Sequence, residues 1–193
     1  MKTFELKGTD RTDLGKKATK ALRREGLIPA ILYGGETTEA KHFVVSQSDI
    51  RKLVYTPEVF LVNLTVGNES MMAILKDIQF HAVTDEILHI DFLHIFESKP
   101  VVIEVPVELE GLAEGVKAGG KLSLDVRKLK VRALYKDLPE KLHINIEHLS
   151  LGKSIQVGEL SFDKLELLNA KNAVVCRVQL TRAARGLAAK GGN

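Results

Sequence analysis

Apolar and polar residues alternate along most of this chain at a spacing of two, which is the period of a β-strand. Residues 3–8 ("TFELKG") give the first example, and the same pattern recurs to near the end of the chain. Residues 15–25 follow the helical period instead, and Gly26 and Pro29 supply stop signals after them. Three polar residues before this predicted helix are its candidate caps: Asp10, Thr12 and Asp13.

The pattern predicts two domains, both rich in strands. A polar interruption that ends in proline, residues 96–100 ("FESKP"), separates them, so we expect domains over residues 1–96 and 97–182. The first has a further short helix over residues 46–54 and fits a small β-barrel with helices, while the second is all-β. We expect residues 183–193 to form a disordered basic tail. The fold class is therefore mainly β with a few helices.

Residues 101–111 ("VVIEVPVELEG") show the strictest alternation, with three glutamates on one face of the predicted strand. Pro106 falls on that face and has no backbone N–H, which predicts an edge strand or a bulged one. An edge over residues 101–109 would let a partner protein add a strand of its own.

The composition, 45% hydrophobic and 27% charged, is that of an ordinary soluble globular protein. No apolar stretch approaches the roughly 20 residues that span a bilayer, so no membrane contact is expected. Residues 1–10 lack the apolar core of a signal peptide. Cys176 is the single cysteine, so we expect neither a disulfide framework nor a thiolate metal site, and a cytoplasmic location fits best.

Positive charge is concentrated near the start of the chain. Residues 1–24 hold eight Lys or Arg against three acids, whereas residues 25–97 hold four against eleven. Residues 98–193 hold sixteen cations against eleven acids. A basic segment on an otherwise acidic domain is the pattern of a local electrostatic footprint.

The cations of the predicted helix share one face, an arc of roughly 120° at 100° per residue. Leu14, Ala18, Ala21 and Leu22 fall opposite, and we expect them to pack on the barrel. The cationic face contains no acid that would pair at i to i+4 spacing. It is either a solvated helix face or a face that binds a polyanion. The five cations are Lys16, Lys17, Lys20, Arg23 and Arg24.

Three residues of predicted strands are candidates for contact with a nucleotide. Tyr33 precedes two glycines, so its ring either caps the core or stacks on a base. His89 and Asp91 share one strand face, as a solvated polar pair or as hydrogen-bonding partners of bases and ribose. His94 points to the other face, so we expect no metal site here.

The sequence shows no catalytic constellation. The glycine-bearing segment 111–121 is not a Walker loop, because Leu122 follows its final Gly-Lys pair where Ser or Thr is required. The serines lack the G-x-S-x-G pattern. We therefore expect neither an enzyme nor a cofactor, and no small-molecule substrate.

Two segments carry a resemblance to a known family: residues 11–35 ("RTDLGKKATKALRREGLIPAILYGG") and 76–92 ("KDIQFHAVTDEILHIDF"). They resemble the bacterial family of large-subunit ribosomal protein twenty-five, which binds 5S ribosomal RNA. The shared motifs are Gly-Lys, Leu-Arg, Gly, Pro-Ala and Tyr-Gly in the first segment, and Asp-x-Gln followed by His-x-Asp-Phe in the second. The two-domain length is similar to the family's long, general stress (Ctc) type.

The resemblance implies a structural, ribosome-bound protein whose barrel docks on 5S rRNA in the central protuberance, beside neighbouring 5S-binding ribosomal proteins. Lys20, Ala21 and Phe80 stand where short members often carry Arg, and Arg24 could compensate for one of them. The alternative is a stress-related protein-interaction module with secondary RNA binding. The RNA-binding residues implied by position are Arg11, Lys16, Lys17, Lys20, Arg23, Arg24, Tyr33, His89 and Asp91.

Overall fold

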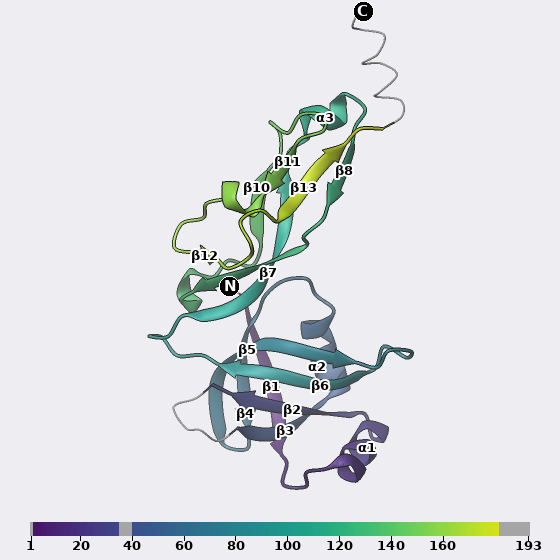
Figure 1. The fold of residues 1–193 in the computed structure, drawn as a ribbon. Coiled ribbons are helices and arrows are strands. Elements are labelled where there is room, and N and C mark those ends of the chain that lie inside the picture. The colour runs from purple at the N-terminus through teal and green to yellow at the C-terminus, as the bar shows by residue number, and fades with distance from the viewer. Residues whose placement is uncertain (1, 35–39, 182–193) are drawn as a thin grey trace, which may run out of the picture. The chain divides into compact units, whose positions relative to one another are not determined.

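The computed structural model describes residues 2–34 and 40–181 (Figure 1). The chain forms two compact units, which we call the N-terminal and the C-terminal unit. The first runs from the N-terminus to Val101 and includes Leu134–Lys136, and the second comprises Val102–Ala133 and the chain from Asp137 onward. The predicted tail, residues 183–193, lies outside the described residues.

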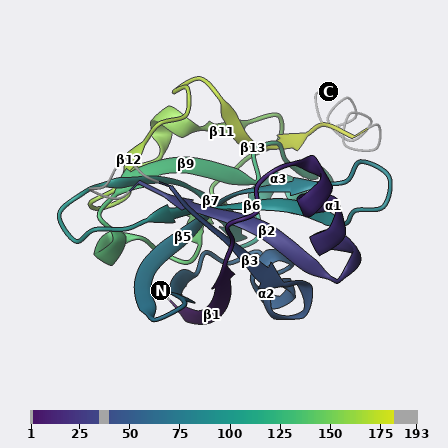
Figure 2. The ribbon, with the colours of Figure 1, turned by 90° about the horizontal axis from the view of Figure 1, so that it is seen from below.

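The N-terminal unit is a closed barrel with the strand order β1-β3-β2-β6-β5-β4. Pairing of β1 with β4 closes the barrel and is parallel, as is the pairing of β2 with β6. Figure 2 shows α1 outside the strands, next to β2 and β6. The strands are β1 (Thr3–Asp10), β2 (Leu27–Tyr33), β3 (Lys41–Ser46), β4 (Leu61–Val66), β5 (Glu69–Phe80) and β6 (Ile87–His94). The helices are α1 (Lys16–Arg24) and α2 (Gln47–Val54).

Strand alternation fills the barrel. In β2, for example, Ile28, Ala30 and Leu32 are buried in the core cluster. Phe43 of β3 and Phe92 of β6 are fully buried there, with ring centroids 5.8 Å apart. Burying a side chain of this size contributes roughly 1.5–3 kcal/mol, so the barrel has a hydrophobic core of its own.

The ends of α1 are set by glycines. Gly15 is the N-cap and no side chain caps the helix, so the prediction of Asp10, Thr12 and Asp13 as caps was wrong. The predicted stop at Gly26 is confirmed: its φ of +77° is left-handed, which glycine adopts without strain at Cβ. This turn directs the chain into β2.

α1 buries none of its side chains, so the expectation that its apolar face packs on the barrel was wrong. Leu14, just before the helix, is 59% exposed, and Ala21 is also exposed. Of the four residues of that predicted apolar face, Ala18 and Leu22 are half-buried. An isolated helix shorter than about 12 residues is marginal in water, so a helix of 9 residues depends on its tethers to the barrel.

The C-terminal unit contains two small sheets with the orders β10-β7-β9-β12 and β11-β13-β8. The glycine-bearing segment after β7 contains the one-turn helix α3 (Glu114–Lys117). Short 3-10 turns occur at Tyr135–Asp137 and Val157–Glu159. The strands are β7 (Val101–Glu110), β8 (Lys121–Leu124), β9 (Lys128–Ala133), β10 (Leu142–Asn145), β11 (Ser154–Gln156), β12 (Glu166–Leu167) and β13 (Val174–Gln179).

β7 lies between β9 and β10, so its prediction as an edge strand was wrong where β10 covers it. The parallel pairing with β10 runs over Val107–Glu110 and thus begins just after Pro106. The missing N–H of Pro106 therefore removes no bond from this ladder. Over this stretch no edge is left for the strand of a partner protein.

The acidic face of β7 is neutralised by neighbouring strands. The Glu104 carboxylate lies 3.7 Å from the Lys130 ammonium, and the Glu108 carboxylate lies 3.2 Å from the Lys141 ammonium. The Glu110 carboxylate is 2.7 Å from Nδ1 of His143. Exposed pairs of this kind stabilise by only about 0–1 kcal/mol each, but the two lysines offset the charges of Glu104 and Glu108 on this sheet face.

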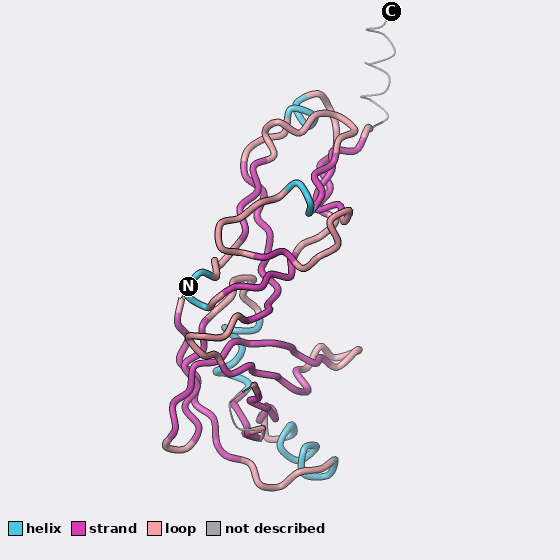
Figure 3. Tube along the Cα trace, turned by 60° about the vertical axis from the view of Figure 1, so that its left-hand side comes forward, coloured by secondary structure: helices cyan, strands magenta, loops and turns pink. Residues whose placement is uncertain are grey.

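The predicted fold class is confirmed: a mainly β protein with short helices, an N-terminal barrel and a C-terminal β domain. Figure 3 shows how strands predominate in both units. Within the described ranges, no helix is long and apolar enough to cross a membrane.

Candidate nucleic-acid interface

Four cations of α1 form no ion pair with any other described residue, and all four are exposed: Lys16, Lys17, Lys20 and Arg24. Lys16, Lys20 and Arg24 follow one another at a spacing of four and so form one row along the helix. Like charges at this spacing destabilise a helix by a few tenths of a kcal/mol per pair. A bound polyanion would relieve this repulsion.

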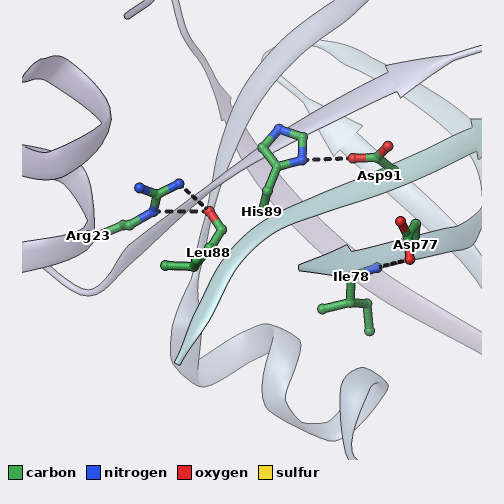
Figure 4. Close-up of polar contacts among 6 residues, drawn as sticks. All are labelled: Arg23, Asp77, Ile78, Leu88, His89 and Asp91. Atoms are coloured by element: carbon green, nitrogen blue, oxygen red, sulfur yellow. Dashed lines mark hydrogen bonds and ion pairs between the residues drawn. The ribbon is translucent and has the colours of Figure 1, made fainter. Parts of the chain in front are cut away.

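The other two predicted arginines are tethers of the helix. Nε and Nη2 of Arg23 donate to the carbonyl oxygen of Leu88 in β6, at 3.0 and 2.7 Å (Figure 4). Nε of Arg11 donates to the Asp13 carbonyl at 2.8 Å, and Nη2 donates to the Thr19 hydroxyl at 3.2 Å. A guanidinium has five N–H donors, so each arginine keeps donors for a further partner.

The three candidate residues of the strands, His89, Asp91 and Tyr33, lie at increasing distance from α1 along β6 and the neighbouring β2. His89 and Asp91 follow Leu88 on β6, and β2 runs parallel beside it with Tyr33 opposite Leu93. At 3.3 Å per residue, the line from Leu88 to Leu93 is about 17 Å long. The structure thus brings the α1 cations and all three strand residues to one surface. We call Lys16, Lys17, Lys20, Arg24, Tyr33, His89 and Asp91 the candidate interface.

Hydrogen bonding orients the polar groups of this surface. Nδ1 of His89 and Oδ1 of Asp91 are 2.7 Å apart, and both side chains are about a quarter exposed (Figure 4). Since an ionised carboxylate only accepts, Nδ1 carries the hydrogen and Nε2 remains for an outside partner. Burial raises the pKa of Tyr33, and the charges of Asp91 and Asp77 raise it further. The Tyr33 hydroxyl therefore stays protonated and can donate.

The sequence analysis missed two residues of β5, Asp77 and Gln79, which lie directly opposite Asp91 and His89. Oδ1 of Asp77 accepts the backbone N–H of Ile78 at 2.9 Å (Figure 4). The Asp-x-Gln motif was a visible signal of these residues. Only the register of β5 against β6 shows which partners they face.

The other groups weighed from the sequence, a metal site, His94 and Cys176, show no arrangement for chemistry among the described residues. No group of three or more His, Cys, Asp or Glu among the described residues is arranged to hold a metal. His94 is half-buried, its ring centroid lies 4.4 Å from that of Phe96, and burial lowers its pKa. Cys176 is buried in β13, and burial raises the pKa of its thiol.

Comparison with known proteins identifies both units. Residues 6–92 match the Ribosomal L25p family, and residues 100–182 match the C-terminal domain of ribosomal protein TL5. Large ribosomal subunit protein bL25 of Porphyromonas gingivalis is 65% identical, covering 98% of this chain and 99% of that protein. The bL25 protein of Azobacteroides pseudotrichonymphae is 64% identical, covering 96% and 97%. That of Bacteroides fragilis is 58% identical and covers both chains fully.

These matches confirm the resemblance seen in the sequence, including the two-domain form. The relatives carry the name of a ribosomal protein and not of an enzyme. The chain belongs to the L25 family of ribosomal proteins, as a non-enzymatic component of the large subunit on the ribosome in the cytoplasm.

Proposed function

We propose that the N-terminal unit binds 5S rRNA and thereby holds the protein in the central protuberance, among the neighbouring 5S-binding ribosomal proteins. One observation carries this proposal. Four cations that form no ion pair with another described residue stand on α1, and Arg23 ties this helix to the strand that presents His89 and Asp91. The solvated-face reading gives no account of this juxtaposition.

The two parts of the candidate interface have different tasks. The α1 cations contact phosphates, which fix register and orientation but carry no sequence information. Tyr33, His89 and Asp91 meet base edges and ribose hydroxyls in a wide, shallow minor groove. Because the Asp91 carboxylate accepts hydrogen bonds and repels phosphate, it selects amino and hydroxyl groups.

The test is titration of the full-length protein with three RNAs over a range of salt: intact 5S rRNA, 5S rRNA without its internal loop, and tRNA. Four neutralised phosphates predict a slope of log affinity against log salt of roughly −3 to −4. We expect intact 5S rRNA to bind most tightly. Equal affinity for all three RNAs would refute a specific site.

Variants separate the two tasks. Lys20→Ala should reduce the salt slope by about 0.7–0.9 on every RNA, because it removes one phosphate contact. Tyr33→Phe removes only a hydroxyl and should reduce the difference in binding affinity between intact and loop-deleted 5S rRNA. Lys171→Ala in the C-terminal unit is the matched control, because Lys171 is also exposed. This substitution should change neither the salt slope nor the difference in affinity between the two 5S RNAs.

A further inference from the structure

The turn between β5 and β6, residues 81–86, presents an apolar side chain at its tip. Val83 is 85% exposed, more than any other large hydrophobic side chain of the described residues. Phe80, the last residue of β5, is 44% exposed. A single exposed apolar residue is common on protein surfaces, so the surroundings decide whether this one has a partner.

Hydrogen bonds hold this turn in one conformation. Nδ1 of His81 accepts the backbone N–H groups of Val83 and Thr84, at 3.3 and 3.2 Å. The backbone of His81 also bonds to Glu86 and Asp85, at 2.8 and 3.0 Å. Val83 is therefore presented outward by a braced turn, and a partner that covers it has little loop to order on binding.

The charge of the turn is negative. Asp85 and Glu86 follow Val83 and form no ion pair within the described part of the chain. No Lys or Arg occurs between Lys76 and Lys99 in the sequence. Arg23 of α1 lines the same small pocket as Glu86, but its guanidinium donates to Leu88. A phosphate backbone would be repelled here, whereas a basic protein surface would be attracted.

The chemistry of Phe80 favours the same kind of partner, a protein surface. Its partly exposed aromatic ring offers apolar surface to a protein partner and carries no charge that would pair with phosphate. The tip nevertheless projects on the same side of the barrel as α1 (Figures 1 and 2). A polyanion-binding helix and an acidic, apolar turn thus lie on one side of the N-terminal unit.

We propose that Phe80, Val83, Asp85 and Glu86, which we call the hairpin tip, bind a basic protein of the large subunit through apolar side chains flanked by lysine or arginine. The partner surface supplies a shallow apolar site for Val83 and Phe80. Its cations face Asp85 and Glu86. α1 meets RNA beside it, so the N-terminal unit bridges an RNA and a protein.

Photocrosslinking in assembled subunits tests the class of partner directly. Val83 of the full-length protein is replaced by p-benzoylphenylalanine, the protein is bound to purified large subunits that lack it, and the irradiated product is analysed by mass spectrometry. We expect a crosslink to a lysine- or arginine-rich peptide of one ribosomal protein. A crosslink to rRNA, or none, would overturn the proposal. The same probe at Tyr55, 61% exposed at the end of α2, is the control and should not give that peptide.

Affinity measurements give a second, independent readout. Val83→Asp should weaken binding to depleted large subunits roughly tenfold, the size expected for losing one apolar anchor, and leave binding to isolated 5S rRNA within twofold. Glu86→Gln should weaken subunit binding at low salt only. If the tip faced RNA, Glu86→Gln would tighten RNA binding instead, and that result would contradict the proposal. Should the wild-type protein fail to bind isolated RNA, the crosslink still decides the partner of the tip.

Discussion

Arg23 and Arg24 are adjacent cations of α1, yet the structure predicts different effects when each is replaced by alanine. Arg23 donates two hydrogen bonds to the Leu88 carbonyl, whereas the Arg24 guanidinium forms no hydrogen bond or ion pair with another described residue. Both substitutions remove one charge and the same side chain from the same turn of helix. The pair is therefore its own control for net charge and helix propensity.

The magnitude follows from the two bonds. Hydrogen bonds of charged groups contribute about 1.5–3 kcal/mol each in favourable settings, but these are exposed, so we expect about 1 kcal/mol for both together. Because α1 buries no side chain, this loss falls on the docking of the helix and not on the barrel. A loss of about 1 kcal/mol corresponds to a roughly fivefold shift toward the undocked, frayed helix.

Amide hydrogen exchange measures this shift. In Arg23→Ala the amides of α1 should exchange roughly fivefold faster than in the wild type, while those of β2 stay unchanged. In Arg24→Ala the α1 amides should keep their protection, and the salt slope of RNA binding should fall by about 0.7–0.9. Identical α1 exchange in the two variants would refute the role of the Leu88 contact.

Four further predictions concern the fold and the titration of its side chains. Gly26→Ala should destabilise the N-terminal unit by about 1 kcal/mol in thermal unfolding, because φ is left-handed at +77° while an added Cβ would have no described atom within 4 Å beyond the neighbouring residues of the chain. Gly8→Ala should cost more, since its Cβ would lie 2.6 Å from the buried Phe43 ring. Burial and the charges of Asp91 and Asp77 raise the pKa of Tyr33, so the folded state holds the phenol proton more tightly than the unfolded state does. The stability that depends on the protonated phenol is therefore fully present below the ordinary tyrosine pKa and is lost as pH rises through the folded-state pKa. Asp91→Asn should lower the Tyr33 pKa in an NMR titration, and no change would contradict the assignment. Cys176 is fully covered and burial raises its thiol pKa, so iodoacetamide should label it only on unfolding.

The strands could be predicted from sequence because alternation is a local property. Each inward residue of β9, such as Leu129 or Val131, is recognised from the polar residues on either side of it. The closure of the barrel could not be predicted in the same way. It depends on parallel pairing of β1 with β4 and of β2 with β6, between segments separated by more than fifty residues.

The residues of the candidate interface likewise differ in how far the sequence predicts them. The cationic row of α1 follows from helical spacing, and His89 and Asp91 follow from strand spacing. The tether from Arg23 to Leu88 spans 65 positions and ends on a backbone carbonyl, which every residue carries. No side-chain pattern marks such an acceptor. The position of Asp77 opposite Asp91 likewise depends on a register that shifts at a bulge in β5.

The parallel pairing of β2 with β6 also has a consequence for the protein during its synthesis. The barrel remains open until β6, its last strand, has been made, whereas α1 is complete after Arg24. At 5–20 residues per second, β6 follows α1 by roughly 4 to 14 s. For that interval the basic segment belongs to a nascent chain without a barrel to orient it. If the N-terminal unit binds RNA as proposed, the segment alone can offer RNA only its charge, and specific recognition has to wait until the final strand docks.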